Sequence, residues 1–384
     1  MAPRRILILT HTGREDAIQS GLDVADELLT YGLQPVMMRD DAEAINQAIT
    51  TGAVPRRTMV ADVLEDAGQL GDIDLCVVLG GDGSVLRAAE LVRGTELPLL
   101  AVNLGHIGFL AESERTDIPS TVAAVAEEAY DVEERMTIDV RVLVDDQLVA
   151  RTWALNEASV EKSNRERTLE VVIGVDDRPI STFGCDGVVM ATPTGSTAYA
   201  FSAGGPVVWP EVETMLMVPL SAHALFARPL VVSPRSVMSV DVLQRTNEAG
   251  VLWCDGRRTV DLPQAARVEV TRSDQPVRLA RLSHTPFSER LVRKFKLPTK
   301  GWRGSISEAD RAEIAARSLA RRQSAVSTGS SGVEVVEPHH LAPKVEVTEP
   351  RTTELPVVTK ADEKNPLVTR AQLRADRTSN RSED

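Results

Sequence analysis

The chain has 384 residues, of which 42% are hydrophobic and 26% are charged, a mixture typical of globular proteins with two or three domains. Its formal net charge of −13 argues against DNA or RNA as the main partner, because phosphate backbones are bound by clustered Lys and Arg. A small anionic ligand remains compatible with this charge, since backbone N–H groups and one or two arginines can hold it locally.

Three cysteines, Cys76, Cys185 and Cys254, lie far apart and show no C-x-x-C spacing. This pattern is typical of reduced thiols in a cytosolic protein. The apolar run at residues 6–9 is too short for the core of a signal peptide, and no apolar run approaches the length of a membrane span. We therefore expect a cytoplasmic protein that binds neither membranes nor nucleic acids.

The first third of the chain alternates apolar runs with amphipathic segments. The runs typical of buried strands cover residues 4–10, 34–38, 74–79 and 97–102. The segments typical of helices cover residues 14–31, 41–49, 85–92 and 121–130. Because strands that alternate with helices form a parallel sheet with helices on both faces, residues 1–135 are predicted to form an α/β domain.

From residue 136 the pattern changes to short β-type runs, separated by turn signals such as Asp145-Asp146 and Asp176-Asp177. The runs cover residues 138–144, 148–153, 169–175, 188–191, 230–232, 237–243 and 268–271. A second domain, β-rich and sandwich-like, is therefore predicted over residues 136–286. We expect residues 287–300 to cross back to the first domain, with a helix at 287–297.

The last part of the chain, residues 301–384, differs from the rest in composition. After Trp302 it contains no Phe, Trp or Tyr and is rich in Val, Glu, Pro, Thr and Ser. Such a segment buries too little apolar surface to offset the entropy of ordering it. We predict that this tail is largely disordered.

The sequence Gly80-Gly81-Asp82-Gly83-Ser84 joins a predicted strand to a predicted helix, which is where open α/β sheets bind ligands. Glycines allow a sharp turn and a close approach to a ligand, and the N–H groups of the loop and of the helix N-terminus attract phosphate. A carboxylate in such a loop would repel phosphate, so Asp82 indicates metal binding or proton transfer from a nucleophile. Arg87, one helical turn after Ser84, is placed to pair with a phosphate.

The alternative for this loop is an ordinary glycine-rich turn in which Asp82 caps the helix. The strand-loop-helix context favours a ligand site. No Gly-Lys-Ser/Thr follows the glycines, so the loop is not a P-loop.

Two further segments combine polar side chains suited to a nucleotide. Residues 191–206 are rich in Gly, Ser and Thr, which offer many donors to sugar hydroxyls and phosphates, although a structural loop with Ser/Thr caps is the alternative. Asn156-Glu157 pairs an amide with a carboxylate that can bind a base or a ribose, although an ordinary polar turn has the same appearance. No His/Cys/Asp cluster has the spacing of a metal site.

Taken together, these segments resemble the NAD kinase family. Gly80-Gly81-Asp82-Gly83 resembles the family's GGDG motif, and residues 103–110 resemble its NxGxxGFL segment. Asn156-Glu157 is similar to its NE/D pair, and residues 192–206 are similar to its long glycine-rich motif. The four segments follow one another in the family's order.

The resemblance implies an α/β domain followed by a β-rich domain, with the site between them. It implies NAD as one substrate, ATP or in some members inorganic polyphosphate as the phosphoryl donor, and a divalent metal such as Mg²⁺. Asp82 takes the position of the catalytic carboxylate. The other positions that match ligand-binding residues of the family are Gly80, Gly81, Gly83, Arg87, Asn156, Glu157, Arg167, Asp186, Thr197, Ala198, Tyr199, Ala200, Phe201 and Ser202. A homodimer or homotetramer that completes the site across subunits is also implied.

Two other functions are compatible with some of these motifs. A lipid kinase of the diacylglycerol or sphingosine type shares GGDG, but it predicts an apolar or basic surface that faces a membrane. A dinucleotide sensor without catalysis keeps Asn156, Glu157 and residues 197–202, but it has no need of Asp82.

Overall fold

The structure is a computed structural model that describes residues 3–55, 60–105, 108–111, 113–114, 117–164, 167–225, 227–243, 250–282 and 285–299, together with residues 313, 316 and 317. The chain divides into two compact units, residues 1–306 and residues 307–384. The predicted disorder of the tail lies outside the described residues and stays a prediction.

An eight-stranded sheet forms the first domain, in the order β3-β2-β1-β4-β5-β20-β7, with β6 paired to β5. Its strands are β1 (Arg5–Thr10), β2 (Gln34–Met38), β3 (Asp62–Leu64), β4 (Leu75–Leu79), β5 (Leu99–Asn103), β6 (Ser113–Glu114), β7 (Asp131–Arg135) and β20 (Val277–Arg281). Each described strand pair in this sheet is parallel, except the antiparallel pair of β20 with β7.

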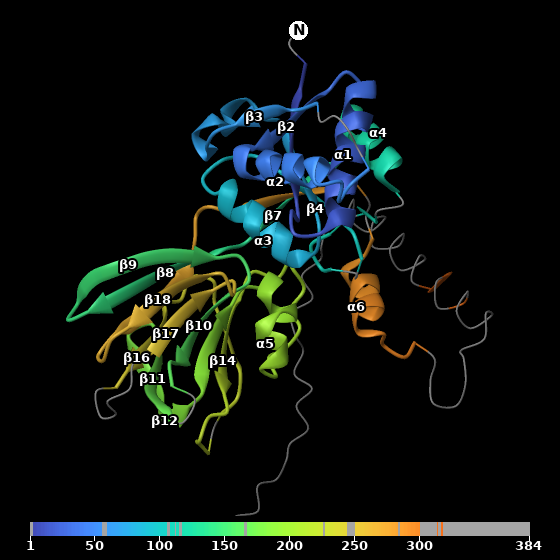
Figure 1. Ribbon diagram of the computed structural model, residues 1–384. Coiled ribbons are helices and arrows are strands. Elements are labelled where there is room, and N and C mark those ends of the chain that lie inside the picture. The colour runs from blue at the N-terminus through green and yellow to red at the C-terminus, as the bar shows by residue number, and fades with distance from the viewer. Residues whose placement is uncertain are drawn as a thin grey trace, which may run out of the picture. The chain divides into compact units, whose positions relative to one another are not determined.

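Helices cover both faces of this sheet (Figure 1). They are α1 (Glu15–Thr30), α2 (Arg39–Thr50), α3 (Asp82–Leu91) and α4 (Ile118–Ala126), with a 3-10 helix, η1, at Ala67–Asp72. Ile8 of β1 packs in one core cluster with Leu22 of α1, whereas its neighbour Leu9 packs in another cluster with Val85 of α3. The central strands are therefore buried on both faces, which explains their continuous apolar runs. The predicted α/β domain is confirmed.

The second domain consists of two six-stranded antiparallel sheets, in the orders β15-β14-β13-β10-β17-β18 and β12-β11-β16-β19-β8-β9. Its strands are β8 (Ile138–Val144), β9 (Gln147–Ala154), β10 (Glu157–Lys162), β11 (Leu169–Val175), β12 (Arg178–Cys185), β13 (Gly187–Ala191), β14 (Met215–Leu220), β15 (Leu230–Val232), β16 (Met238–Val242), β17 (Gly250–Cys254), β18 (Arg258–Leu262) and β19 (Arg267–Arg272).

The two sheets share one hydrophobic core. Val140 and Val171 of one sheet belong to the same buried cluster as Val160 and Leu252 of the other, so the sheets pack face to face. The second face of the β13–β14 pair is covered by α5 (Tyr199–Ser202), which follows the 3-10 helix η3 (Thr194–Thr197). The predicted β-rich domain is confirmed.

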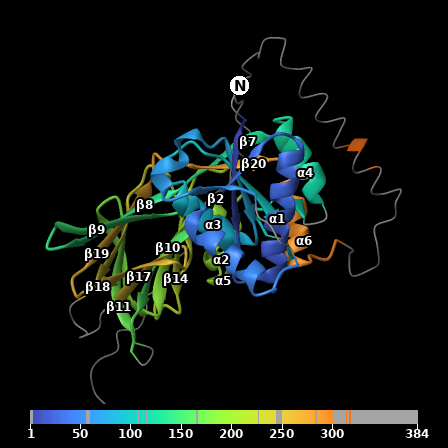
Figure 2. The same cartoon turned by 45° about the horizontal axis from the view of Figure 1, so that its top comes forward.

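The chain returns to the first sheet through β20, which pairs with β5 and β7. Figure 2 shows β20 beside β7. Residues 277–281 fell within the range 136–286 expected for the β-rich domain, because partners far earlier in the chain leave no local signal. The boundaries predicted for the two domains, 1–135 and 136–286, stay a proposal.

One more helix, α6 (Phe287–Phe295), follows β20. The ring of Phe295 stacks on Phe201 of α5 at a centroid distance of 4.3 Å and lies 5.7 Å from Phe109. Such aromatic pairs add to the energy of apolar burial. Helix α6 thus contacts both the segment at residue 109 and α5. None of the helices in the described part of the chain is long and apolar enough to cross a membrane.

Candidate functional site

The glycine-rich loop lies between the end of β4 and the start of α3, as the sequence predicted. Gly80 has a φ of +155°, and a Cβ on it would lie 2.2 Å from the Oγ of Ser84. A side chain at this position is therefore excluded by both conformation and space. Helix α3 begins at Asp82, with Gly81 as its N-cap, and the first N–H groups of a helix have no partner within the helix.

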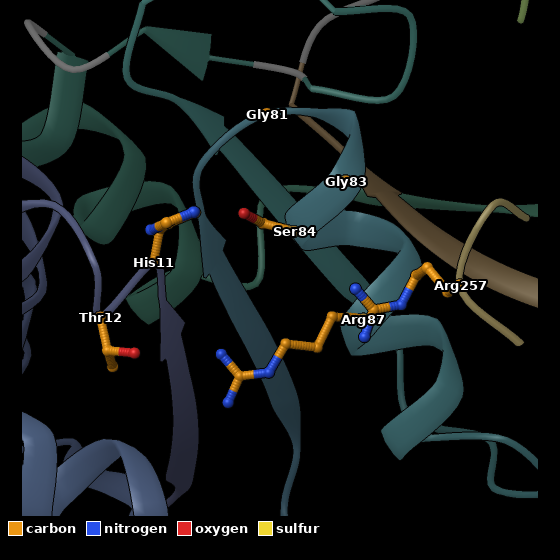
Figure 3. Close-up of a pocket in the computed structure, with 7 residues that line it drawn as sticks. All are labelled: His11, Thr12, Gly81, Gly83, Ser84, Arg87 and Arg257. Carbon is orange, nitrogen blue, oxygen red and sulfur yellow. The ribbon is translucent and has the colours of Figure 1, made fainter.

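A pocket of about 460 Å³ opens beside this loop. It is lined by His11, Thr12, Gly81, Gly83, Ser84, Arg87 and Arg257. Figure 3 shows His11 and Ser84 pointing toward each other across the pocket. Two arginines, a helix N-terminus and small hydroxyl groups form a site suited to phosphate, at the carboxyl edge of the sheet where ligands of open α/β folds bind.

Arg87 lines this pocket, and its guanidinium is also held by protein groups. It pairs with the carboxylate of Asp41, which is almost fully buried, and Nη1 donates to the carbonyl of Thr10 at 3.3 Å. Burial raises the pKa of Asp41, and the charge and hydrogen bond of Arg87 oppose that rise. Arg87 is therefore anchored from behind, at the edge of the pocket where the sequence predicted a phosphate partner.

The carboxylate of Asp82 joins two of the predicted motifs. It accepts the backbone N–H of Phe109 at 3.3 Å and that of Leu110 at 3.2 Å. A Cβ on Gly108 would lie 2.3 Å from Oδ1 of Asp82, so glycine is needed there for space. Residues 106 and 107 of the same motif lie outside the described residues.

The pair Asn156-Glu157 lies at the junction of β9 and β10, and each residue is 8% exposed. The Asn156 carbonyl accepts the N–H of Thr192 at 2.9 Å, and Oε2 of Glu157 accepts the N–H of Tyr199 at 3.3 Å. The structure therefore brings together two motifs that the sequence presented separately. A Cβ on Gly195 would lie 2.0 Å from the Asn156 carbonyl oxygen, which shows how closely the backbones approach.

This close approach carries a prediction. Gly195→Ala is expected to destabilise the fold by about 1–3 kcal/mol, because the backbone of residue 156 must shift to admit a methyl group. Thermal unfolding measures the effect, and Gly71→Ala, where a Cβ meets nothing within 4 Å, is the matched control. A melting temperature of Gly195→Ala equal to that of Gly71→Ala contradicts the close packing of residues 156 and 195.

Glu157 has an unusual electrostatic environment. Burial raises its pKa to about 8, and the negative charges of Asp255 and Glu161 act in the same direction. The N–H of Tyr199 opposes the rise. A carboxyl group that titrates near neutral pH is typical of functional sites.

The predicted segment at residues 197–202 forms the end of η3 and all of α5. Thr197 and Ala198 are half-buried, whereas Tyr199, Phe201 and Ser202 are exposed. Ala200 is fully buried against β13 and β14, so its side chain supports the fold. A wall for a ligand is left to its exposed neighbours and to backbone groups.

Two predicted site residues, Asp186 and Arg167, lie away from Asn156 and Glu157 within one chain. Asp186 pairs with Nζ of Lys162 at 2.5 Å, a contact that lowers the pKa of Asp186. Lys162 ends β10 whereas Glu157 begins it, so the two sites are separated by about 16 Å at roughly 3.3 Å per residue. Arg167 is exposed in the loop that follows the same end of β10.

Several residues of the site were not predicted from the sequence. His11 and Thr12 follow β1 at the same sheet edge as the glycine-rich loop, and the rule for open α/β sheets provides a signal for them. Arg257 comes from the turn between β17 and β18, which local sequence presents as an ordinary Asp-Gly turn. No three His, Cys, Asp or Glu side chains of the described residues gather in a position to hold a metal ion.

Comparisons with known proteins show the family of the chain. The chain matches the family model of the ATP-NAD kinase N-terminal domain over residues 6–130 and that of the C-terminal domain over residues 155–282. It is 57% identical over 303 residues to the NAD kinase of Leifsonia xyli subsp. xyli, an overlap of 79% of this chain and 98% of that protein.

The fold is also similar to solved structures. A yeast NADH kinase has a TM-score of 0.69 at 21% identity, covering 78% of this chain and 90% of that one. An NAD kinase from Archaeoglobus fulgidus has a TM-score of 0.56 at 22% identity, covering 76% and 98%. Since two family models match most of the chain and the identity is 57% over 303 residues, the chain belongs to the NAD kinase family.

Proposed function

We propose that this phosphotransferase moves the terminal phosphoryl group of ATP to the 2′-hydroxyl of the adenosine ribose of NAD, which produces NADP. The observation that carries the proposal is the position of Asp82. It stands between two glycines that line the phosphate pocket, and two backbone amides hold its carboxylate. An acid placed among groups that attract anions is suited to direct a hydroxyl toward phosphorus.

The pocket beside the loop supports ATP as the donor. Arg87, Arg257 and the N-terminus of α3 surround it with positive charge and N–H groups, as a triphosphate requires. The Archaeoglobus fulgidus NAD kinase of similar fold was solved in complex with ATP. Polyphosphate presents the same terminal group and is the alternative donor, and parallel assays with the two donors distinguish them.

A divalent metal is part of the same proposal. The pocket offers the Ser84 hydroxyl but no carboxylate among its lining residues, which fits Mg²⁺ held largely by the phosphate oxygens of the donor. When bound there, the metal supplies neutralisation of the charge on those oxygens.

The pair Asn156-Glu157 and the exposed side of residues 197–202 support NAD as the acceptor. A carboxylate accepts hydrogen bonds from ribose hydroxyls, and an amide both donates to and accepts from a base. The yeast NADH kinase of similar fold was solved in complex with NADH. We propose that NAD binds along these residues with its adenosine ribose toward Asp82.

The proposed mechanism depends on position and electrostatics. Each oxygen of Asp82 accepts one amide N–H and keeps a lone pair for the ribose hydroxyl. The carboxylate directs the hydroxyl oxygen in line with the terminal phosphorus and accepts its proton as the new bond forms. Arg87 and Arg257 then stabilise the charge on the phosphate oxygens.

One assay separates this function from its two rivals. The purified protein is incubated with NAD, ATP and Mg²⁺, and NADP and ADP are measured. We expect equal amounts of the two products. A parallel incubation replaces NAD with diacylglycerol or sphingosine. A phosphorylated lipid in that incubation, with no NADP in the first, indicates a lipid kinase. NAD binding without any product indicates a sensor, and either result overturns the proposal.

Arg257 provides a specific test of the donor pocket. Arg257→Gln is expected to raise KM for ATP about tenfold, because a hydrogen bond from a charged group contributes about 1.5–3 kcal/mol. Arg278→Gln, which removes a guanidinium paired with Glu96 and Glu134, is the control and should leave KM unchanged. Steady-state kinetics measure both, and an unchanged KM for ATP in Arg257→Gln shows that the pocket does not hold the donor.

We also propose that the protein forms a homodimer or homotetramer. Asp186 and Arg167, which match ligand-binding positions of the family, lie beyond the far end of β10 from Glu157. A second copy is the natural source of these residues for the site. A cytoplasmic location is proposed as well, supported by three cysteines that are buried as free thiols.

A further inference from the structure

Asp255 holds the backbone of Asn156 and Glu157 in place. Its carboxylate accepts three consecutive backbone N–H groups, from Leu155 at 3.0 Å, Asn156 at 2.7 Å and Glu157 at 3.3 Å. Its own N–H donates to the Glu157 carbonyl at 2.9 Å. Asp255 is 6% exposed and has a φ of +54°, so its placement is specified by the surrounding structure.

Arg258 holds this carboxylate. Its Nη2 lies 2.7 Å from Oδ2 of Asp255, and its guanidinium carbon lies 4.4 Å from the ring centroid of Trp153. Burial raises the pKa of Asp255, while the three amides and the charge of Arg258 lower it. Arg258 therefore supplies, together with the three amides, the counter-charge that a buried carboxylate needs.

The same guanidinium reaches the helix that follows the phosphate loop. Nε of Arg258 lies 3.3 Å from Oε1 of Glu90, which belongs to α3. Glu90 also pairs with Nε of Arg257 at 3.1 Å, and Arg257 lines the phosphate pocket. A short chain of charges thus joins the donor pocket to the backbone of Asn156 and Glu157.

We propose that Arg258 is a positioning residue for the acceptor: acting through Asp255, it orients Asn156 and Glu157 toward NAD, and through Glu90 it ties them to the phosphate-binding helix α3. This inference rests on the proposed function of the site. It assigns to Arg258 a role without contact to either substrate, expressed in NAD binding more than in the chemical step.

The test compares Arg258→Gln with a matched variant in the full chain. Arg93→Gln is the control, because Arg93 lies over the same Trp153 ring at 4.2 Å but donates to Thr137, Ser273 and Gln275. For each protein, KM for NAD, KM for ATP, kcat and the melting temperature are measured, with the Kd of NAD determined by equilibrium dialysis without ATP.

We expect Arg258→Gln to raise the Kd and KM for NAD about tenfold, with kcat reduced less than about threefold. Arg93→Gln should lower the melting temperature without raising the Kd of NAD. Arg258→Lys, which keeps a charge beside Asp255 but cannot contact both carboxylates, should give a Kd for NAD between those of the wild type and Arg258→Gln. Equal losses of NAD affinity in Arg93→Gln and Arg258→Gln, or wild-type affinity in Arg258→Gln, overturn the proposal.

The test also covers the cases in which Arg258→Gln does not fold or the wild-type protein makes no NADP. If Arg258→Gln does not fold, Arg258→Lys decides, since a wild-type Kd and KM for NAD in that variant, whose ammonium cannot reproduce the guanidinium contacts to both carboxylates, contradicts the proposed link. If the wild-type protein binds NAD but makes no NADP, the proposed function fails, while the Kd values still decide the role of Arg258.

Discussion

Asp82→Asn is expected to lower kcat about 10²–10⁴-fold, the usual contribution of a positioned acid-base group. The amide has nearly the same shape, but it cannot take the proton of the ribose hydroxyl. It also replaces one of two oxygens that accept the N–H groups of Phe109 and Leu110. Because Asp82 acts on the reacting hydroxyl, KM for NAD should change far less than kcat, and steady-state kinetics separate the two.

Asp72→Asn is the control for this substitution. Asp72 is an exposed carboxylate paired with Arg5 on the first domain, away from the motifs of the site, so kcat should stay at its wild-type value. Melting temperatures of both variants establish that any loss of activity is not a loss of fold. Turnover of Asp82→Asn near that of the wild type shows that the carboxylate neither accepts the proton nor directs the hydroxyl.

The second large effect concerns pH and Glu157. Its pKa is raised from an ordinary value of 4.5 to about 8 by burial and by the charges of Asp255 and Glu161, against the N–H of Tyr199. The ionised form, which accepts hydrogen bonds from ribose hydroxyls, therefore appears as pH rises through about 8. We expect kcat/KM for NAD to increase across this range.

Glu157→Gln tests whether Glu157 causes this rise of kcat/KM with pH. The variant should lose the increase near pH 8, and at pH 9 its kcat/KM for NAD should be about 10–100-fold below wild type, the value of a hydrogen bond to a charged group. A pH profile measured from pH 6 to pH 9.5 is sufficient. If kcat/KM of Glu157→Gln still rises near pH 8, another group is titrating.

The same shift makes a prediction of opposite sign for stability. Between pH 4.5 and about 8 the folded protein holds a proton on Glu157 that the unfolded chain has released. The stability that the folded state gains from keeping Glu157 protonated is therefore fully present below pH 4.5, and it is lost as pH rises toward 8. The free energy of unfolding of Glu157→Gln should lack this decline, so activity and stability respond to Glu157 in opposite directions.

The sequence specified the parts of the fold that depend on local patterns. The apolar run that became β4 and the glycines after it predicted a strand followed by a ligand loop, and the structure has both. Helix α3 begins at Asp82, earlier than the expected start at residue 85, because the acid and glycines of the loop form the first turn. Such residues are favoured at helix N-termini, although the sequence alone presents them as a turn.

The parts that the sequence did not specify depend on contacts between distant residues. Strand β20 belongs to the first sheet through pairing with β5 and β7, and its short sequence carries no sign of those partners. Asp255 reads locally as a turn residue before Gly256, yet its carboxylate binds backbone groups at 155–157. The pocket likewise combines His11 after β1, Ser84 in the first turn of α3 and Arg257 between β17 and β18.

In the proposed complex, the adenosine ribose of NAD lies beside Asp82. A crystal structure of the wild-type protein with NAD, Mg²⁺ and a non-hydrolysable ATP analogue tests this position directly, because no phosphoryl transfer consumes the ligands. We predict the ribose 2′-oxygen at about 2.6–3.2 Å from the side chain of residue 82, with the terminal phosphate of the analogue in the pocket lined by Arg87 and Arg257. A ribose bound elsewhere, with its 2′-hydroxyl beyond reach of that side chain, contradicts the account.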